Sequence, residues 1–287
     1  MRIAIATDTN SGISVEEGAR LGVHVVPMPV LIDGSIYYEG VNLTPESFYR
    51  SLREGRQVST SQPAPGDVLA LWDKLLEEYD QVVYIPMTSG LSASCQTATA
   101  LAGDYDGKVQ VVDNHRISVP QRESVMDAMA LAAAGCTAPE IKAELERLAF
   151  DCMIYIGVDT LEYLKRGGRI TAAAAAMGSV LHIKPLLKIQ GERLDAFAKV
   201  RGTKACKQRL LEAMVQTAEK FRRSDGPVSI AAAGSFLSAE EEAAWLAMAR
   251  DTFPGEDIRC DPLALSIGCH VGPGAFGMAV TRRIAVR

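Results

Sequence analysis

The first half of the chain alternates short apolar runs with segments of helical pattern, and this alternation restricts the fold more than any other feature. The runs Arg2–Thr7, Gln81–Pro86 and Lys108–Asp113 are typical of buried strands. Segments of helical pattern follow these runs, including Asp67–Tyr79 and Ser118–Ala134. Strands that alternate with helices predict a parallel sheet covered by helices, as in Rossmann-like α/β domains.

Local turn and cap signals support the prediction of alternating strands and helices. Asp33-Gly34 lies between the apolar segments Val23–Ile32 and Ser35–Glu39, which predicts a hairpin. Thr137 followed three residues later by Glu140 is a capping box and predicts the start of a helix.

The second half has a different order of elements. After the expected strand Met153–Val158, the segments Leu186–Ile189 and Arg193–Val200 flank the turn sequence Gln190-Gly191-Glu192 and predict another hairpin. Long helical patterns and further strands follow, which together indicate an α+β arrangement. Because 287 residues exceed the usual size of a single core, we expect two domains, an N-terminal α/β domain over residues 1–150 and a C-terminal α+β domain over residues 151–287.

The stretch STSQPAP carries three consecutive hydroxyl residues, Ser59, Thr60 and Ser61, and then two prolines. Pro63 and Pro65 prevent helical hydrogen bonding and stiffen the backbone, so the whole stretch is expected to be a loop. Its hydroxyls could bind a ligand. Equally, they could satisfy only the backbone and water, as loop serines and threonines often do.

A second hydroxyl cluster follows the expected strand that ends at Pro86. The segment Met87–Ser92 contains Ser89, Gly90 and Ser92 and leads directly into a helical pattern. A strand, a short polar turn and a helix N-terminus favour a bound anion, and open α/β sheets bind ligands at this edge. The simpler alternative is that Ser92 is only a helix cap.

The third candidate lies near the C-terminus, where His270 is surrounded by glycines and a proline. The segment Ile267–Ala275 is expected to be a constrained turn that brings the backbone close to a ligand. Histidine offers a donor and titrates near neutral pH. A purely structural role for His270 remains the alternative.

Two arginines lie around the Gly167-Gly168 pair. The pair predicts the C-terminal end of a short helix, and Arg166 suits the negative end of that helix. Arg169 follows the cap and is expected to point outward, where its guanidinium suits a phosphate or an acidic partner.

Charge and cysteine content exclude several classes of protein. The net charge of −5 provides no basic field for nucleic acid. The six cysteines form no C-x-x-C pair and the four histidines are scattered, so neither a metal site nor a disulfide framework is expected. No apolar run is long enough to form a membrane span or a signal segment. These features predict a cytoplasmic protein.

Five motifs together resemble the DegV family of bacterial fatty-acid-binding proteins. They occur in the family's order and at its approximate spacing: STSQPAP, TSGLSASCQTA, TLEYLKRGGRI, HIKPLLKIQGE and CHVGPGAFG. The resemblance covers essentially the whole chain, including IATDTNSGIS at the N-terminus.

This resemblance implies a two-domain carrier that holds one long-chain fatty acid, such as palmitate, in a tunnel and has neither a cofactor nor catalytic residues of its own. It implies that Thr60 and Ser92 hydrogen-bond the carboxylate and that His270 assists. The neighbouring Ser59, Ser61, Ser89 and Gly90 would support these loops. Some family members present the acid to a dihydroxyacetone-kinase-like fatty acid kinase, which phosphorylates it, and Arg169 with Arg166 would face that kinase.

Some residues depart from the family pattern, and two other functions are considered beside the carrier. The segment Ala93–Gln96 replaces a usual Gly-Thr-Tyr-Gln, Val271 stands where Thr or Ser is usual, and His182 replaces a usual Ser. One alternative is an acyl or phosphoryl hydrolase, although GLSAS is not a G-x-S-x-G motif. Another is a binder of a small phosphate ester, which predicts a lysine or arginine in the head-group motifs.

Overall fold

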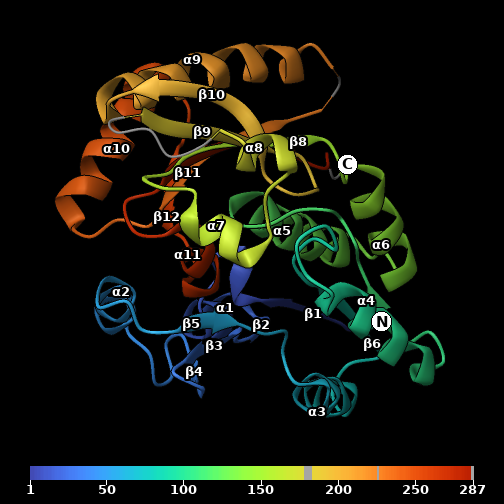
Figure 1. Ribbon diagram of the computed structural model, residues 1–287. Coiled ribbons are helices and arrows are strands. Elements are labelled where there is room, and N and C mark those ends of the chain that lie inside the picture. Colours follow the sequence, from blue (N-terminus) through green and yellow to red (C-terminus); the bar gives the residue numbers. More distant parts are fainter. Residues whose placement is uncertain (178–182, 225, 286–287) are drawn as a thin grey trace.

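The computed structural model of the protein describes residues 1–177, 183–224 and 226–285, and His182 therefore lies outside the described residues. The described strands form three sheets (Figure 1). Two of these sheets use strands from the first half of the chain, and the third uses strands from the second half.

The four-stranded sheet is fully parallel, as the alternating pattern predicts. Its order is β2-β1-β6-β7, formed by Val23–Val26, Ile3–Asp8, Gln81–Ile85 and Val109–Val111. Alternate residues of one strand pack on opposite faces. Ala4 and Ala6 of β1 contact one apolar cluster, whereas Ile5 between them contacts another.

Helices cover both faces of this parallel sheet. One face packs against α3 (Pro65–Leu76) and α4 (Ser94–Ala102). The other packs against α5 (Val119–Ala133) and α6 (Ala138–Arg147), and α6 begins with the predicted capping box. The short elements α1 (Val15–Leu21), η1 (Thr9–Ser11) and η2 (Gly103–Tyr105) complete this half. The α/β character expected of the first half is confirmed.

A small antiparallel sheet corrects two expectations from the sequence. It has the order β4-β3-β5, formed by Ser35–Tyr38, Pro29–Ile32 and Val58–Thr60. The hairpin at Asp33-Gly34 is confirmed, but Val23–Ile32 is divided between two sheets. The expectation that STSQPAP is entirely a loop is wrong, because Ser59 and Thr60 belong to β5 and pair with β3. Helix α2 (Pro45–Arg53) packs against this sheet.

The second half forms a mixed sheet of six strands. Its order is β10-β9-β8-β13-β11-β12, formed by Asp195–Arg201, Ile183–Ile189, Cys152–Gly157, Phe276–Arg282, Val228–Gly234 and Arg259–Pro262. β9 and β10 form the predicted antiparallel hairpin. Helices α9 (Thr203–Arg222) and α10 (Ala239–Thr252) cover one face with a large apolar cluster. The α+β expectation is confirmed.

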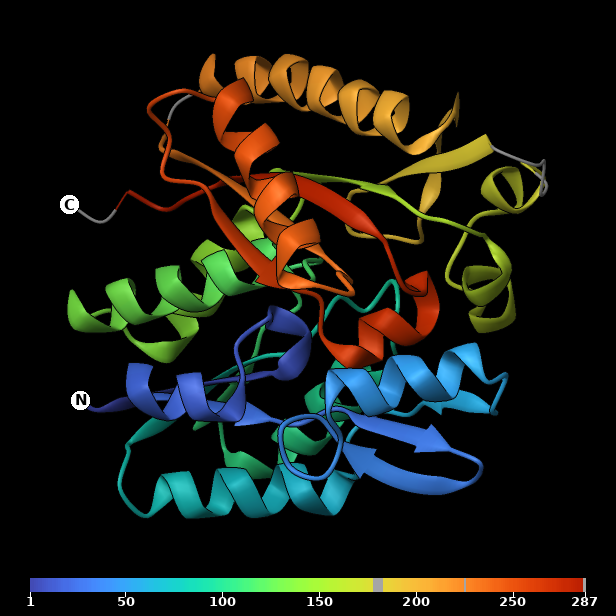
Figure 2. The same cartoon turned by 90° about the vertical axis from the view of Figure 1, so that its left-hand side faces the viewer.

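The face of the six-stranded sheet opposite α9 and α10 is directed toward the first half of the chain. Figure 2 shows α9 at one side of the molecule, the first-half elements at the other, and α5 with α11 (Leu265–Val271) between them. Helices α7 (Glu162–Gly167) and α8 (Ala172–Ala175) follow β8. Strands on either side of residue 150 belong to different sheets, and a domain boundary near that residue stays a prediction.

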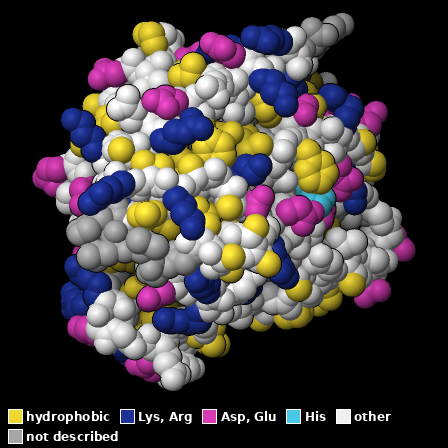
Figure 3. Space-filling model, turned by 45° about the horizontal axis from the view of Figure 1, so that its top comes forward, with side chains coloured by type: hydrophobic (Ala, Val, Ile, Leu, Met, Phe, Trp, Pro, Cys, Tyr) yellow, Lys and Arg dark blue, Asp and Glu magenta, His cyan; other side chains and the backbone are white. Residues whose placement is uncertain are grey.

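The outer surface carries charges of both signs. On the face that Figure 3 presents, Lys and Arg side chains lie around exposed apolar side chains. Among the described residues, no helix has both the length and the apolar character that a bilayer span requires.

Candidate ligand-binding site

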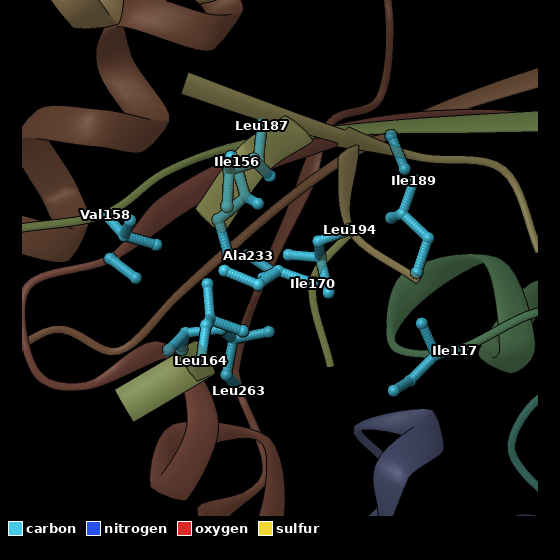
Figure 4. Packing of buried hydrophobic residues seen from close by; sticks show 14 of the residues in the cluster. Ile117, Ile156, Val158, Leu164, Ile170, Leu187, Ile189, Leu194, Ala233 and Leu263 are labelled. Carbon is cyan, nitrogen blue, oxygen red and sulfur yellow. The ribbon is translucent and has the colours of Figure 1, made fainter. Parts of the chain in front are cut away.

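An apolar cavity of about 270 Å³ lies between the two halves of the molecule. This volume is slightly below the usual range for small-molecule pockets, roughly 300–1,000 Å³. Both halves supply apolar lining residues: Met28, Met87 and Ile117 from the first, and Ile156, Ile189, Leu194 and Leu263 from the second. In Figure 4, Ile117 lies opposite Ile189 and Leu194. The cavity therefore suits an apolar ligand.

Thr60 and His270 meet at the wall of this cavity although 210 residues separate them. Pairing of β5 with β3 places Thr60 opposite Val30, and helix α11 brings His270 to it. Thr60 Oγ1 and His270 Nε2 are hydrogen-bonded at 3.0 Å. The structure thus brings together two of the three residues for which the resemblance implies a role at the carboxylate.

His270 lies in a helix and not in the turn that the glycine-rich segment suggests. It occupies the last turn of α11, which ends at Val271 and is followed by the cap residue Gly272. Burial lowers the pKa of His270 to about 4, and the positive charge of Arg169 contributes to this shift. Near neutral pH the imidazole is therefore uncharged, so it takes part in hydrogen bonding without supplying a positive charge.

Ser92 also lines the cavity and lies two residues before the start of α4. Its Oγ accepts a hydrogen bond from the backbone N–H of Ser94 at 3.1 Å. A hydroxyl can accept one hydrogen bond and still donate its proton to a ligand. The N-cap residue of α4 is Ala93, which makes no side-chain cap hydrogen bond, so the alternative that Ser92 is the helix cap is wrong.

The loop that carries Ser92 rests on the β9–β10 hairpin. The Thr88 hydroxyl donates to the carbonyl of Gly191 at 2.5 Å and accepts from the N–H of Gly90 at 3.1 Å. A Cβ atom on Gly90 would lie 2.5 Å from the same carbonyl oxygen. Gly90 is required here for close approach, and Ser89 is tied back by a hydrogen bond from its N–H to Asp113.

The remaining hydroxyls of the first cluster differ in exposure and contact. Ser61 lies at the cavity wall but is exposed, and its N–H bonds the carbonyl of Pro29 at 3.4 Å. Ser59 precedes Thr60 on β5, is exposed and does not line the cavity. Successive strand residues point to opposite sides, which accounts for the difference between Ser59 and Thr60.

Arg169 does not point outward as expected. Its Nε donates to the carbonyl of Leu91 at 3.2 Å, its Nη1 donates to the carbonyl of Gly167, and the side chain lines the cavity. The chain turns at Gly168, which has the left-handed conformation of the predicted cap, and this turn directs the guanidinium inward. Arg166 is exposed and lies 5.8 Å from the centre of the Tyr163 ring.

Sequence reasoning missed several polar residues of the cavity wall. Gln62 lies there and accepts a hydrogen bond from Thr97 at 3.0 Å. Asn10, Ser118 and Ser266 line another part of the wall. Ser118 and Ser266 are single polar residues between apolar neighbours, whereas Asn10 and Gln62 lie among other turn-forming residues. No local pattern distinguishes any of them from an ordinary turn or cap residue.

The site contains little that indicates hydrolytic chemistry. Within the described ranges, no carboxylate hydrogen-bonds His270 to orient it as a base. In the same part of the chain, no group of three or more potential metal ligands gathers.

The comparisons with known proteins agree with this architecture. Residues 2–283 match the family model described as an uncharacterised protein of the DegV family. The chain belongs to the DegV family. It is 34% identical to a DegV domain-containing protein of Deinococcus radiodurans, with 98% of each chain covered. It is 30% identical to protein DegV of Bacillus subtilis, with 97% of this chain and 98% of that protein covered.

Solved structures of DegV proteins share the whole fold. A DegV family protein from Thermus thermophilus, described by its fatty acid binding, superposes with a TM-score of 0.87 at 33% identity, covering 98% of this chain and all of the other. DegV from Bacillus subtilis, described as a fatty acid binding protein, gives 0.85 at 28% identity, covering 99% of this chain and all of the other.

Proposed function

We propose that this DegV protein is a carrier that binds one long-chain fatty acid, with the tail in the apolar cavity and the carboxylate at Thr60, Ser92 and His270. The observation that carries the proposal is the cavity itself, whose mainly apolar wall includes these three uncharged polar side chains. Fatty acid binding by the Thermus thermophilus and Bacillus subtilis relatives supports it.

Burial of the tail supplies most of the affinity. Each buried methylene contributes about 0.8 kcal/mol, so roughly fourteen methylenes of palmitate give a gross term near 11 kcal/mol. Immobilising the chain and the cavity wall reduces this sum. Each charge-assisted hydrogen bond from a hydroxyl to the carboxylate adds about 1.5–3 kcal/mol. The polar groups therefore mainly fix the position of the head group.

The charge distribution favours a monoanion with a long apolar part over a small phosphate ester. Arg169 is a positive group at the cavity wall, but two backbone carbonyls already occupy its Nε and Nη1. The groups at Thr60, Ser92 and uncharged His270 are those of a weak anion site. A small phosphate ester would leave most of the apolar wall without a partner.

We further propose that the bound carboxylate is presented to a fatty acid kinase, which converts it to an acyl phosphate. Uncharged hydroxyl donors leave the carboxylate oxygen nucleophilic enough to accept a phosphoryl group. Arg166 directly precedes Gly167, whose carbonyl holds the Arg169 guanidinium, and is exposed, so it is suited to an acidic or phosphate-bearing surface of the kinase.

The carrier proposal is tested by native mass spectrometry of the purified protein, followed by extraction and identification of the released lipid. We expect about one fatty acid per chain. In the double variant Thr60→Ala/Ser92→Ala, loss of two charge-assisted hydrogen bonds should weaken palmitate binding at least tenfold. Ser59→Ala is the matched control, since it removes an exposed hydroxyl of the same strand. A wild-type protein that stays empty when offered palmitate and oleate contradicts the proposal.

The kinase step requires a separate test with a fatty acid kinase added in excess of the carrier. Arg166→Ala should retain palmitate affinity and lower acyl-phosphate formation roughly fivefold, which corresponds to about 1 kcal/mol for one exposed charge contact. Lys220→Ala removes an equal charge from exposed α9 and serves as the control. Equal turnover by wild type and Arg166→Ala would remove Arg166 from the docking surface.

A further inference from the structure

Three polar side chains form a second group in the cavity wall, separate from the proposed carboxylate site. They are Asn10 of η1, Ser118 directly before α5, and Ser266 in the first turn of α11. Their sequence neighbours in the wall are apolar, including Ile117, Val119 and Ile267. The group therefore interrupts a surface that otherwise suits a hydrocarbon chain.

Hydrogen bonds within this group are incomplete. Ser266 donates its hydroxyl proton to Asn10 Oδ1 at 2.6 Å. Among the described residues, the one hydrogen-bond acceptor of the Asn10 side-chain NH₂ is Met87 Sδ at 3.1 Å, and a thioether is a weak acceptor. Asn10 thus retains an N–H that can bond another group in the cavity.

The side chain of Ser118 lacks a hydrogen-bond partner among the described residues. Its backbone N–H donates to the carbonyl of Asn10 at 2.8 Å, which fixes its position. Its hydroxyl makes no hydrogen bond to any residue in the described ranges, and Ser118 is only 9% exposed. Buried hydroxyls are rarely left without a partner, because an unpaired polar group in an apolar site is destabilising.

Ser118 also has an unusual backbone conformation. Its φ of 57° and ψ of −140° lie outside the regions that residues with a side chain ordinarily occupy. Such conformations persist only where the surroundings impose them, and they occur preferentially at binding and active sites. The strained backbone holds an unpaired hydroxyl at the wall of the cavity.

The charge of the surroundings determines which ligand group fits. Buried Asp8 lies beside Asn10, and its side-chain oxygens accept hydrogen bonds from the N–H of Asn10, the N–H of Met87 and the side chain of Gln121. No cation makes a hydrogen bond or an ion pair with Asn10, Ser118 or Ser266 in the described part of the chain. A second carboxylate is therefore disfavoured, whereas a neutral hydroxyl can both donate and accept here.

The position of the group relative to His270 indicates where on the ligand that hydroxyl lies. Ser266 and His270 are four residues apart on α11 and share one face of the helix. Side chains at this spacing have Cβ atoms about 5–6 Å apart. A ligand group bound at Ser266 is therefore close to the carboxylate end of a fatty acid whose head group is at His270.

We propose that the cavity recognises long-chain fatty acids that carry a hydroxyl near the carboxylate, such as 3-hydroxypalmitate, through Ser118, Asn10 and Ser266. This inference rests on the proposed carrier function and narrows its ligand class. A site that hydrogen-bonds a ligand hydroxyl discriminates against the analogue without it, because the buried groups of the site are then left unpaired.

The test compares the affinities of the delipidated protein for palmitate, 3-hydroxypalmitate and 16-hydroxypalmitate by displacement of a fluorescent fatty acid. The two hydroxy acids have the same composition and differ only in the position of the hydroxyl. We expect 3-hydroxypalmitate to bind about tenfold more tightly than 16-hydroxypalmitate, and more tightly than palmitate. Equal or weaker binding of 3-hydroxypalmitate relative to palmitate overturns the inference and indicates that water satisfies the group.

Variants separate this inference from the carrier proposal. Ser118→Ala keeps the Cβ atom and removes only the hydroxyl, and we expect it to abolish the preference for 3-hydroxypalmitate while palmitate affinity stays within about twofold. Ser266→Ala repeats the test at a second residue of the group. Ser92→Ala should weaken the binding of all three acids by the same factor. If the wild type binds none of the acids, the carrier proposal fails; if it binds palmitate without a preference, only the hydroxyl site fails.

Discussion

At the scale of single residues, His270 combines a polar role with an unusually apolar setting. Burial and the nearby charge of Arg169 hold its pKa at about 4, while Thr60 supplies its hydrogen bond. The free protein thus keeps an uncharged imidazole over the physiological pH range.

This lowered pKa predicts a pH dependence of stability. The usual pKa of 6.5 applies to the unfolded chain, so between pH 6.5 and about 4 the unfolded state binds a proton that the folded state does not. The contribution of His270 to the free energy of unfolding is therefore fully present above pH 6.5. It falls as the pH is lowered, by about 2–3 kcal/mol at pH 4.5.

Urea unfolding of delipidated protein measures this effect. His270→Gln keeps a hydrogen-bonding side chain and removes the titration, so the difference in unfolding free energy between variant and wild type should grow in the variant's favour from pH 7.5 to pH 4.5. A difference that is constant across this range would show that His270 is not the responsible group. Other titrating carboxyls, such as Asp261, cancel because both proteins contain them.

At the scale of elements, local signals predicted those parts of the structure that local interactions determine. The hairpin at Asp33-Gly34 follows from two residues that adopt positive φ, and the start of α6 follows from the reciprocal hydrogen bonds of Thr137 and Glu140. The family resemblance implied that Thr60, Ser92 and His270 lie near one another. In the structure all three line the same cavity.

The elements that sequence reasoning missed depend on distant partners. Helix α11 has no side-chain cap of its own; the first N–H, of Leu265, bonds the carboxylate of Glu39 at 2.9 Å, 226 residues away. Strand β5 exists because β3 pairs with it. The inward direction of Arg169 depends on the Leu91 carbonyl. No window of the sequence contains both members of these pairs.

The packing of α7 against α11 gives a prediction at this scale. A Cβ atom on Gly167 would lie 2.3 Å from His270 Nδ1, so Gly167→Ala must displace the imidazole from Thr60. We expect palmitate affinity to fall about tenfold, which equals the loss of one hydrogen bond to a charged group, and isothermal titration calorimetry measures it. Gly66→Ala is the matched control, since open space surrounds that position in α3. Unchanged affinity in Gly167→Ala would mean that His270 does not contact the ligand.

At the scale of the whole molecule, the two halves meet through polar contacts as well as through the cavity. Arg122 of α5 forms ion pairs with Glu17 of the first half and, at 3.8 Å, with Asp261 of the second. Buried Arg116 donates to the carbonyl of Leu148 at 2.6 Å and to that of Arg282 at 3.4 Å. These contacts bind the halves into one unit around the space for the ligand.

Because both halves line the cavity, a bound fatty acid should stabilise the molecule as a unit. A ligand that binds only the folded state at a free concentration 100 times its Kd adds about 2.7 kcal/mol to the free energy of unfolding. We expect calorimetry of the delipidated protein to show palmitate shifting one cooperative transition upward. At the same palmitate concentration Thr60→Ala/Ser92→Ala should shift less, since its Kd is larger, whereas Ser59→Ala should match the wild type. If calorimetry shows two transitions and palmitate shifts only one of them, the ligand lies within a single half. That result would contradict a cavity lined by Ile117 on one side and by Ile189 and Leu194 on the other.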